Sequence, residues 1–291
     1  MECGSSARQK FSYPTNLEAE MWWIAGTIVV GILLYLLDRE IYFYEGTHLG
    51  PRVQGWLYDR WAKKYDSGKK ESQAQDAEML AQPVLAALKE ISSPLVLDLA
   101  TGTGRLPLTL LREPDFAGNV IALDVSTGML EQAAARLEKY RERVTFLRLI
   151  DFPLPFPDSC FDIVCCMEAL EVMPEMETPL RELFRVLKPG GMLLSSRATD
   201  ASGRRAKVRS VEQFSGLLKQ VGFEQIEIVP WWRWFDRVIA RKPGQFGSPA
   251  DQSITNLLKC PDCGKLRLSP DLRCENCGRQ LVKNQSGVIL Y

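Results

Sequence analysis

An apolar segment that leads into a glycine-rich loop constrains the fold of this chain more than any other feature. The segment LVLDL at 95–99 is short and rich in branched residues, as strands buried in parallel sheets are. The sequence ATGTG follows at 100–104, where two glycines allow a ligand to come close to the backbone. Further strand-like segments are NVIALDV, VTFLRLI, FDIVCCM, GMLLSSR, GFEQIEIVP and RWFDRVIARKP. Helical stretches separate several of these segments, and such alternation predicts a doubly wound α/β sheet.

Acidic residues stand at the ends of the first three predicted strands. They are Asp98, Asp124 and Asp151. Because ligands of doubly wound sheets bind outside the carboxyl ends of the strands, we expect the three carboxylates to line one crevice. Asp98 would repel a pyrophosphate, and the sequence RLP after Gly104 lacks the third glycine of the G-x-G-x-x-G dinucleotide fingerprint. Both features argue against a dehydrogenase.

The three acids match the parts of one ligand. A carboxylate at Asp98 can hold an amino group, and one at Asp124 can accept hydrogen bonds from both hydroxyls of a ribose. Asp151 can bind the edge of an adenine whose face is covered by Phe152. A ligand with an amino acid part, a ribose and an adenine but no phosphate is S-adenosylmethionine. The alternative is that the acids cap helices and that the glycines form an ordinary turn.

The stretch from about Gly55 to Pro243 resembles the class I S-adenosylmethionine-dependent methyltransferases. The resemblance is strongest to the small-molecule branch, methyltransferase type 11, which includes quinone-biosynthesis enzymes. The motifs that carry it are VLDLATGTG, VIALDVSTGML, LIDFPLPFPDSCFDIV and LFRVLKPGGMLL. Ala100 replaces the first glycine of the family's D-x-G-x-G-x-G pattern, an exchange expected to cost little. The resemblance implies a Rossmann-like, mostly parallel sheet of seven strands, of which one is antiparallel.

The resemblance also implies a set of residues that contact the cofactor. This set consists of Asp98, Ala100, Thr101, Gly102, Gly104, Asp124, Val125, Met129, Asp151, Phe152 and Met167. The sequence YDRWAKKYD at 58–66 resembles the lid helix of these enzymes. One of its aromatic residues, Tyr58, Trp61 or Tyr65, would then close over the methionine part of the cofactor.

The chemistry of methyl transfer does not require a fixed catalytic group. The methyl group of a sulfonium is already activated, so the protein mainly has to hold the acceptor in line with it. The sequence identifies no catalytic residue, and the candidates for a base are Glu168, Glu171 and Tyr65. Many relatives carry a histidine near this point, where this chain has Val172. Glu171 is expected to line the acceptor pocket; the alternative is that both glutamates cap or solvate a short helix.

An uncharged segment near the N-terminus predicts a membrane anchor. The segment 21–37 covers roughly 25 Å as a helix, close to the roughly 30 Å hydrocarbon core of a bilayer. It is apolar on every side, and aromatic residues stand near its ends, as in interfacial belts. We expect one span, with the catalytic domain in the cytoplasm. The alternative is a helix buried in a core or packed on a partner.

Four cysteines near the C-terminus have the spacing of a metal site. They are Cys260, Cys263, Cys274 and Cys277, arranged as two C-x₂-C pairs, each followed by a glycine. Such pairs predict a closed tetrahedral zinc site of structural type, whereas disulfides are the alternative for an oxidising compartment. The segment resembles small zinc-ribbon proteins that activate RNA and protein methyltransferases, so a folding or docking role is expected.

These features predict five parts of the chain. They are a tail at 1–20, a transmembrane anchor at 21–44, a methyltransferase domain at 45–243, a linker at 244–256 and a zinc ribbon at 257–291. The predicted function is membrane-tethered methylation of a small lipid-like or quinone-like acceptor. The alternatives are an RNA or protein methyltransferase guided by the ribbon and a scaffold that binds cofactor without turnover. The formal net charge of zero gives no sign of nucleic-acid binding, and the oligomeric state is left open.

Overall fold

The computed structural model describes residues 16–67, 73–202, 208–245 and 253–291. Most of the tail predicted at 1–20 and the middle of the linker predicted at 244–256 lie outside these ranges. The chain divides into two compact units, Met1–Tyr44 and Glu45–Tyr291.

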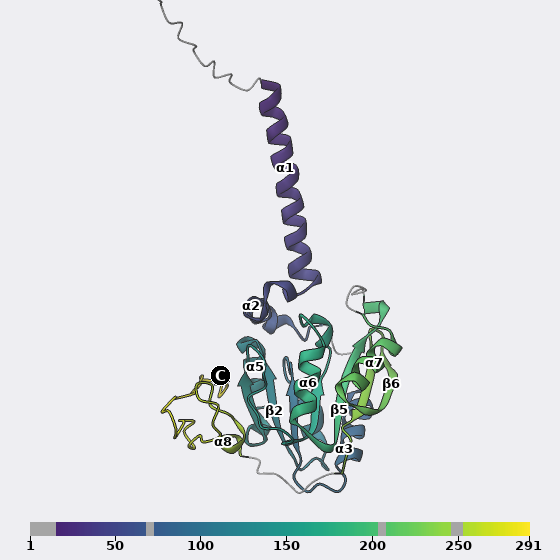
Figure 1. The fold of residues 1–291 in the computed structure, drawn as a ribbon, viewed down its shortest axis with the longest axis vertical. Helices are drawn as coiled ribbons and strands as arrows, with labels where there is room; N and C mark the ends of the chain where they lie inside the picture. Colours follow the sequence, from purple (N-terminus) through teal and green to yellow (C-terminus); the bar gives the residue numbers. More distant parts are fainter. Residues whose placement is uncertain (1–15, 68–72, 203–207, 246–252) are drawn as a thin grey trace, which may run out of the picture. The chain divides into compact units, whose positions relative to one another are not determined.

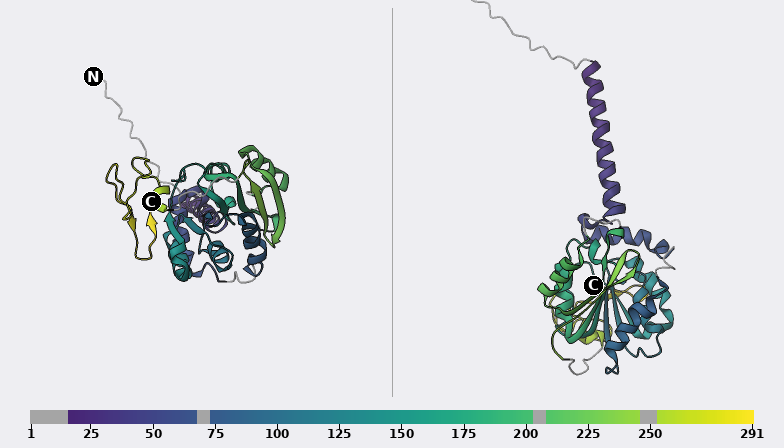
Figure 2. Two further views of the ribbon diagram at one scale, coloured as in Figure 1. Left: turned by 90° about the horizontal axis from the view of Figure 1, so that it is seen from below. Right: turned by 90° about the vertical axis from the view of Figure 1, so that its right-hand side faces the viewer.

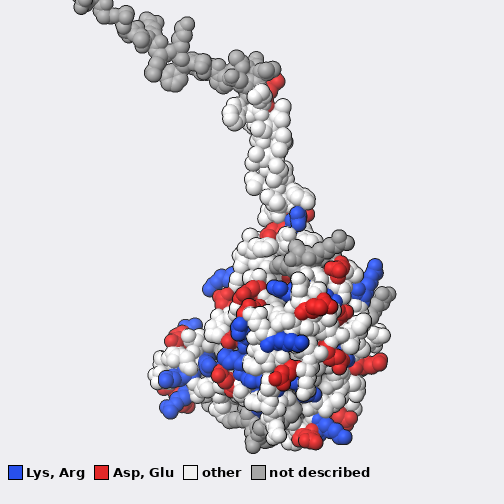
Figure 3. Space-filling model, turned by 45° about the vertical axis from the view of Figure 1, so that its right-hand side comes forward, with Lys and Arg blue, Asp and Glu red and all other residues white. Residues whose placement is uncertain are grey.

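One long helix makes up the described part of the first unit (Figure 1). It is α1 (Asn16–Asp38), and the π-helical turn η1 (Arg39–Phe43) follows it. The stretch Glu20–Phe43 has a mean hydropathy of 1.8, and the apolar window within it has no part buried inside the structure. Figure 3 shows the middle of this helix without charged side chains. The helix is therefore a candidate membrane span by length and composition, and it is not a core helix of the described chain.

A nine-stranded sheet forms the centre of the second unit. Its strand order is β6-β7-β5-β4-β1-β2-β3-β9-β8. The strands are β1 (Leu95–Leu99), β2 (Asn119–Asp124), β3 (Val144–Arg148), β4 (Phe161–Cys166), β5 (Leu187–Ala198), β6 (Glu224–Trp232), β7 (Phe235–Arg241), β8 (Val282–Lys283) and β9 (Ile289–Leu290). The first seven match the expected sheet, with β7 antiparallel to both of its neighbours. The prediction of seven strands was nevertheless two short, because the C-terminal segment adds β8 and β9 to the same sheet.

Helices cover both faces of the sheet, as a doubly wound fold requires (Figure 2). Leu95, Leu97 and Leu99 of β1 lie in one buried cluster with residues of α6 and α7, whereas Val96 lies in the other cluster with residues of α3, α4 and α5. The main helices are α2 (Pro51–Trp61), α3 (Gln82–Leu88), α4 (Arg105–Arg112), α5 (Thr127–Arg136), α6 (Glu177–Val186), α7 (Val211–Val221) and α8 (Ile254–Leu257). Shorter helical turns are η2 (Thr47–Leu49), η3 (Ala62–Lys64), η5 (Ala77–Ala81), η6 (Glu138–Arg143), η7 (Leu170–Val172) and η8 (Asp200–Ser202).

The C-terminal cysteine segment packs onto the edge of the sheet. Strand β9 runs parallel to β3, with Leu147 opposite Ile289. The backbone N–H of Lys259 donates a hydrogen bond of 2.8 Å to the carbonyl oxygen of Pro155, in the loop that follows β3. Leu257 and Leu258 are buried in the same apolar cluster as the strands of the central sheet. The segment is therefore joined to the α/β fold by backbone pairing and by a shared core.

We predict that this edge contributes strongly to stability. Ile289 is fully buried, so Ile289→Ala should lower the free energy of unfolding by roughly 2–5 kcal/mol through lost burial and a new cavity. Val282 on β8 is 57% exposed, and Val282→Ala should cost less than about 0.5 kcal/mol. Denaturant unfolding of both variants in detergent checks the difference. Equal, small losses would show that the ribbon folds independently of the sheet.

Candidate functional site

The loop between β1 and α4 has a backbone that glycine tolerates best. Ala100, Gly102 and Gly104 have φ values of 58°, 54° and 78°. A Cβ on Gly104 would lie 2.9 Å from the side chain of Leu137, so packing also requires glycine there. The alanine at position 100, expected to cost little, adopts a left-handed φ that costs a non-glycine residue roughly 1–2 kcal/mol.

Asp124 at the end of β2 holds this loop against the second strand by hydrogen bonding. Its Oδ2 accepts a hydrogen bond of 2.8 Å from the backbone N–H of Gly102, and its Oδ1 accepts one of 2.9 Å from the N–H of Ser126. Ser126 in turn caps α5, because its Oγ accepts a 3.0 Å hydrogen bond from the N–H of Met129. Burial raises the pKa of Asp124 to about 6, although these backbone donors act in the opposite direction. The carboxylate predicted to bind ribose is therefore oriented before any ligand arrives.

Asp98 is the most deeply buried acid of the site, with 2% of its surface exposed. Burial raises its pKa to about 7, and the nearby charge of Asp124 acts in the same direction. A cationic amino group bound beside Asp98 would favour the ionised form of this carboxylate. The environment thus suits the role that the sequence predicts for Asp98.

A cavity of about 310 Å³ lies at the carboxyl edge of the sheet. The predicted cofactor-binding residues that line it are Ala100, Gly102, Asp124, Val125, Met129, Asp151, Phe152 and Met167. The ends of β1, β2 and β4 and the loop after β3 meet here, which brings most of the predicted set together. That these residues hold a cofactor stays a prediction.

A smaller cavity of about 50 Å³ adjoins the first and shares several of its lining residues. The shared residues are Tyr65, Ala100, Gly102, Met167 and Glu168. Asp98 and Thr101 line this second cavity. Gly104 lines neither cavity, since it faces α5, and its predicted contact with the cofactor has no support from the cavities.

Arg105 adds a charged group that the sequence analysis did not anticipate. Its guanidinium forms ion pairs of 2.7 Å with Asp76 and 2.7 Å with Glu168, and it lies 4.8 Å above the ring of Trp231. Arg105, Glu168 and Trp231 all line the smaller cavity. The signal in the sequence was a basic residue directly after the glycine loop, but its partners come from distant segments.

The three candidate bases have different environments. Glu168 lines both cavities but is paired with Arg105. Tyr65 also lines both, yet burial, followed by the charge of Glu168, raises the pKa of its phenol, which works against a role as base at neutral pH. Glu171 is 2% exposed in η7 and lines neither cavity, so its expected place in the acceptor pocket has no support in the structure.

Helix α2 covers part of the larger cavity. Gln54 and Tyr58 line it, and the Nε2 of Gln54 donates a 2.8 Å hydrogen bond to the carbonyl oxygen of Val172 in η7. A Cβ on Gly55 would lie 3.0 Å from the carbonyl oxygen of Val125, so a glycine at this point lets the helix approach the end of β2 closely. Of the three expected lid aromatics, Tyr58 and Tyr65 line the cavity, and Trp61 packs edge-on against Tyr58. The sequence analysis did not identify Gln54 or Gly55 as residues of the site.

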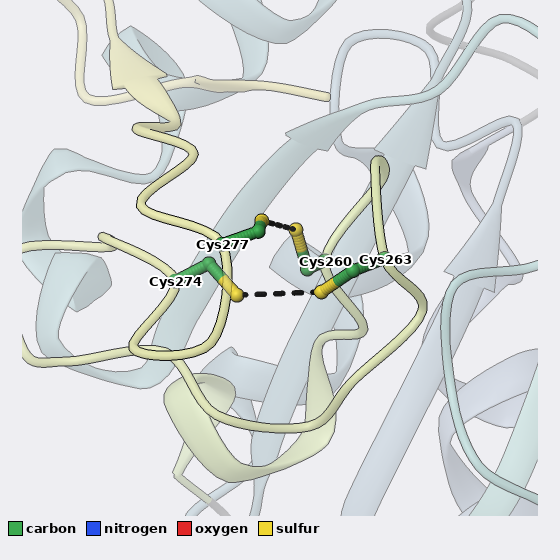
Figure 4. Close-up of side chains that lie close together, drawn as sticks. All are labelled: Cys260, Cys263, Cys274 and Cys277. Carbon is green, nitrogen blue, oxygen red and sulfur yellow. Dashed lines mark hydrogen bonds between the residues drawn. The ribbon is translucent and has the colours of Figure 1, made fainter.

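The four C-terminal cysteines converge from two similar turns (Figure 4). All four sulfur atoms lie within 4.8 Å of one another, and the pairs Cys260–Cys277 and Cys263–Cys274 are 3.5 and 3.6 Å apart. A tetrahedral zinc ion with bonds of about 2.3 Å places its sulfur ligands roughly 3.8 Å apart, so the cluster fits this metal. Four thiolates leave no open position, and a zinc ion held here would be structural.

Comparisons with known proteins define the class. Residues 96–191 match the family described as Methyltransferase domain. Demethylmenaquinone methyltransferase of Symbiobacterium thermophilum is 32% identical over 150 residues, which are 51% of this chain and 60% of the relative. The chain thus spans less than two thirds of that relative.

Two solved structures share the fold. One is a putative S-adenosyl-L-methionine-dependent methyltransferase of Methanococcus maripaludis, with a TM-score of 0.51 and 20% identity over 65% of this chain and 94% of that chain. The other belongs to a complex between the Haloferax volcanii Trm112 methyltransferase activator and a putative methyltransferase, with a TM-score of 0.51 and 22% identity over 66% of this chain and 98% of that chain.

The fold and site define a Rossmann-like α/β domain with a crevice at the switch of its strand order. Together with the family match over residues 96–191, they show that this part of the chain is a methyltransferase domain with the class I fold.

We predict that cofactor affinity rises with pH because Asp98 must ionise to hold a cation. Folding raises the pKa of Asp98 from 3.8 to about 7, so affinity should fall up to about tenfold per pH unit below 7. Without ligand, the raised pKa stabilises the folded protein at low pH, and this contribution is lost as the pH rises from 3.8 to about 7.

Calorimetric titration of cofactor between acid and neutral pH, with Asp98→Asn beside the wild type, checks this prediction. The variant should bind more weakly at neutral pH and with a flatter pH profile. An unchanged slope in the variant would assign the proton to another group.

We also predict one zinc ion per chain, bound by the cysteine cluster. Cys274→Ser should lose the metal and, because Cys274 lies in the shared core, should lower the melting temperature of the whole second unit. Cys160→Ala removes a buried thiol outside the cluster and should retain the metal. Elemental analysis of both purified variants separates the outcomes, and metal loss in both would refute the assignment.

Proposed function

We propose that the protein is a membrane-tethered methyltransferase that transfers the methyl group of S-adenosylmethionine to a small, lipid-like or quinone-like acceptor. The observation that carries the proposal is the larger cavity, in which the glycine loop and two of the strand-end acids meet. The printed name of the Symbiobacterium relative, demethylmenaquinone methyltransferase, supports a quinone-like acceptor. The apolar, unburied helix α1 supports the tether.

We assign this cavity to two molecules, the cofactor and the acceptor. Asp124, Asp151 and Phe152 lie on the side assigned to ribose and adenine. Met173 and Pro179 line the same cavity from the segment after β4, and they offer apolar surface to an acceptor. A volume of about 310 Å³ falls within the range of small-molecule sites.

Within this site the protein would act by orienting the cofactor and the acceptor and by excluding water. The backbone of the glycine loop and Asp98 would fix the methionine part, and α2 would cover the reacting groups. Such orientation can lower a barrier by roughly 7–11 kcal/mol in favourable cases. Exclusion of water favours the step further, because the charge of the sulfonium is dispersed during transfer.

We also propose roles for the other parts of the chain. The proposed domain boundaries lie at 44/45, 243/244 and 256/257, and the site residues are those predicted from the sequence. Zinc in the ribbon would brace the edge strand β9 against β3, near the loop that carries Asp151 and Phe152. A single span with the catalytic unit in the cytoplasm would place this unit where the cofactor is made and used.

A labelling experiment tests the proposed acceptor class. The full chain in detergent is incubated with methyl-labelled cofactor and, in separate reactions, with total membrane lipid, total RNA or cytosolic protein. We expect label in the lipid fraction. Label in RNA or protein would instead support a macromolecular acceptor, and no label despite intact cofactor binding would support a scaffold.

A matched pair of variants links this activity to the site. Asp124→Ala removes a carboxylate that can accept charged hydrogen bonds from the ribose, so we predict a loss of cofactor affinity of roughly 10- to 100-fold. Asp115→Ala, an exposed acid after α4, should bind cofactor like the wild type. Equal affinities in calorimetry would remove Asp124 from the cofactor site.

A further inference from the structure

We propose that the outward face of α2 rests on the surface of an anionic lipid bilayer, so that the helix covering the cavity is also the contact between the second unit and the membrane. The inference rests on the proposed tether and goes beyond it. A tether alone requires no contact between the folded unit and lipid.

The outward face of α2 and its flanking turns combines apolar and basic side chains. Leu49, Val53 and Trp56 are 46%, 38% and 55% exposed, and neighbouring exposed apolar residues of this kind can mark an interaction surface. Arg52 and Arg60 are exposed on the same face, at a spacing of three or four residues from these neighbours. The guanidinium of Arg60 lies 5.1 Å from the centre of the Trp56 ring. We call these five residues the α2 outer face.

The inner side of α2 packs against other parts of the second unit. Gln54, Gly55 and Leu57 are buried, and the first two contact η7 and the end of β2. Asp59 is exposed, and its Oδ1 accepts hydrogen bonds of 2.6 Å from Ser126 Oγ and 2.7 Å from the N–H of Gly128. The α2 outer face carries two arginines, and the single acid of α2 is held by hydrogen bonds to the start of α5.

The length of the connecting chain points to lipid as the occupant. The candidate span ends at Phe43, and α2 begins at Pro51. The residues 44–50 between them reach at most about 25 Å when fully extended. The covalent connection therefore keeps the start of α2 within about 25 Å of the end of the span, within reach of the surface of a bilayer.

The chemistry of the α2 outer face fits that surface. Tryptophan favours the headgroup level of a bilayer, and basic side chains are attracted to anionic lipids. A short helix with an apolar stripe beside arginines has the composition of interfacial helices.

A second arginine–tryptophan pair lies at the same edge of the sheet. The turn between β6 and β7 exposes 40% of Trp234, with the guanidinium of Arg233 5.9 Å from its ring centre. Because β7 is antiparallel to both β5 and β6, this turn lies at the carboxyl edge that also carries the cavity. The edge therefore offers two interfacial contact points.

Photocrosslinking of the full chain in lipid nanodiscs tests the inference. Benzoylphenylalanine replaces Leu33 in the span, Trp56 on the α2 outer face, or Val282 on β8, in three separate proteins. Trp56 and Val282 are 55% and 57% exposed, so the last position is a matched control. In discs of phosphatidylcholine and phosphatidylglycerol, we expect lipid adducts from positions 33 and 56 and none from position 282.

The outcomes separate this inference from the tether. Adducts from position 33 without adducts from position 56 would overturn the lipid contact and leave the tether intact. No adduct from position 33 would remove the tether and the inference with it. A crosslinked dimer from position 56 would show that a second copy covers the face, which also overturns the inference.

Charge reversal provides a second readout that does not depend on the photoreactive group. Arg52→Glu combined with Arg60→Glu should lower the adduct yield from position 56 roughly fivefold or more while leaving that from position 33 unchanged. The same loss should follow when phosphatidylglycerol is omitted. If neither change lowers the adduct yield, the proposed contact between these arginines and anionic lipid is contradicted.

Discussion

The carboxylate of Asp124 is the interaction on which the site depends. It joins the glycine loop after β1 to the start of α5 through the backbone N–H groups of Gly102 and Ser126. These two segments must be held together before a cavity can exist between the ends of β1 and β2. Burial works against the ionised carboxylate, and the two backbone donors offset part of that penalty. One side chain thus shapes the crevice and presents to it the acid that we propose binds the ribose.

The cysteine ribbon extends this construction along the sheet. Strand β9 pairs with β3, and the backbone N–H of Lys259 donates a hydrogen bond to Pro155 in the loop that carries Asp151 and Phe152. An open parallel sheet leaves unpaired backbone groups at its edge, and the C-terminal segment covers those of β3 with β9 in a defined register. The ribbon therefore has a structural reason to be part of the same unit as the methyltransferase fold.

Helix α2 faces two environments. Its inner side closes on the carboxyl ends of β2 and η7, where Gln54 and Gly55 allow close approach. Its outer side keeps Trp56 and its neighbours exposed. Under the proposed function the acceptor resides in the bilayer, and a helix with these two sides would couple the cavity to the lipid surface.

The sequence by itself determined the order of strands and helices, the acids at the strand ends and the cysteine spacing, because these follow from local periodicity and short motifs. Only the tertiary structure decided that Arg105 pairs with Asp76 and Glu168, that Glu171 lies outside the cavities, and that β8 and β9 join the sheet. Each of these depends on segments that are far apart in the chain. The pairing of such segments is set by packing and burial, for which a linear pattern has no local signal.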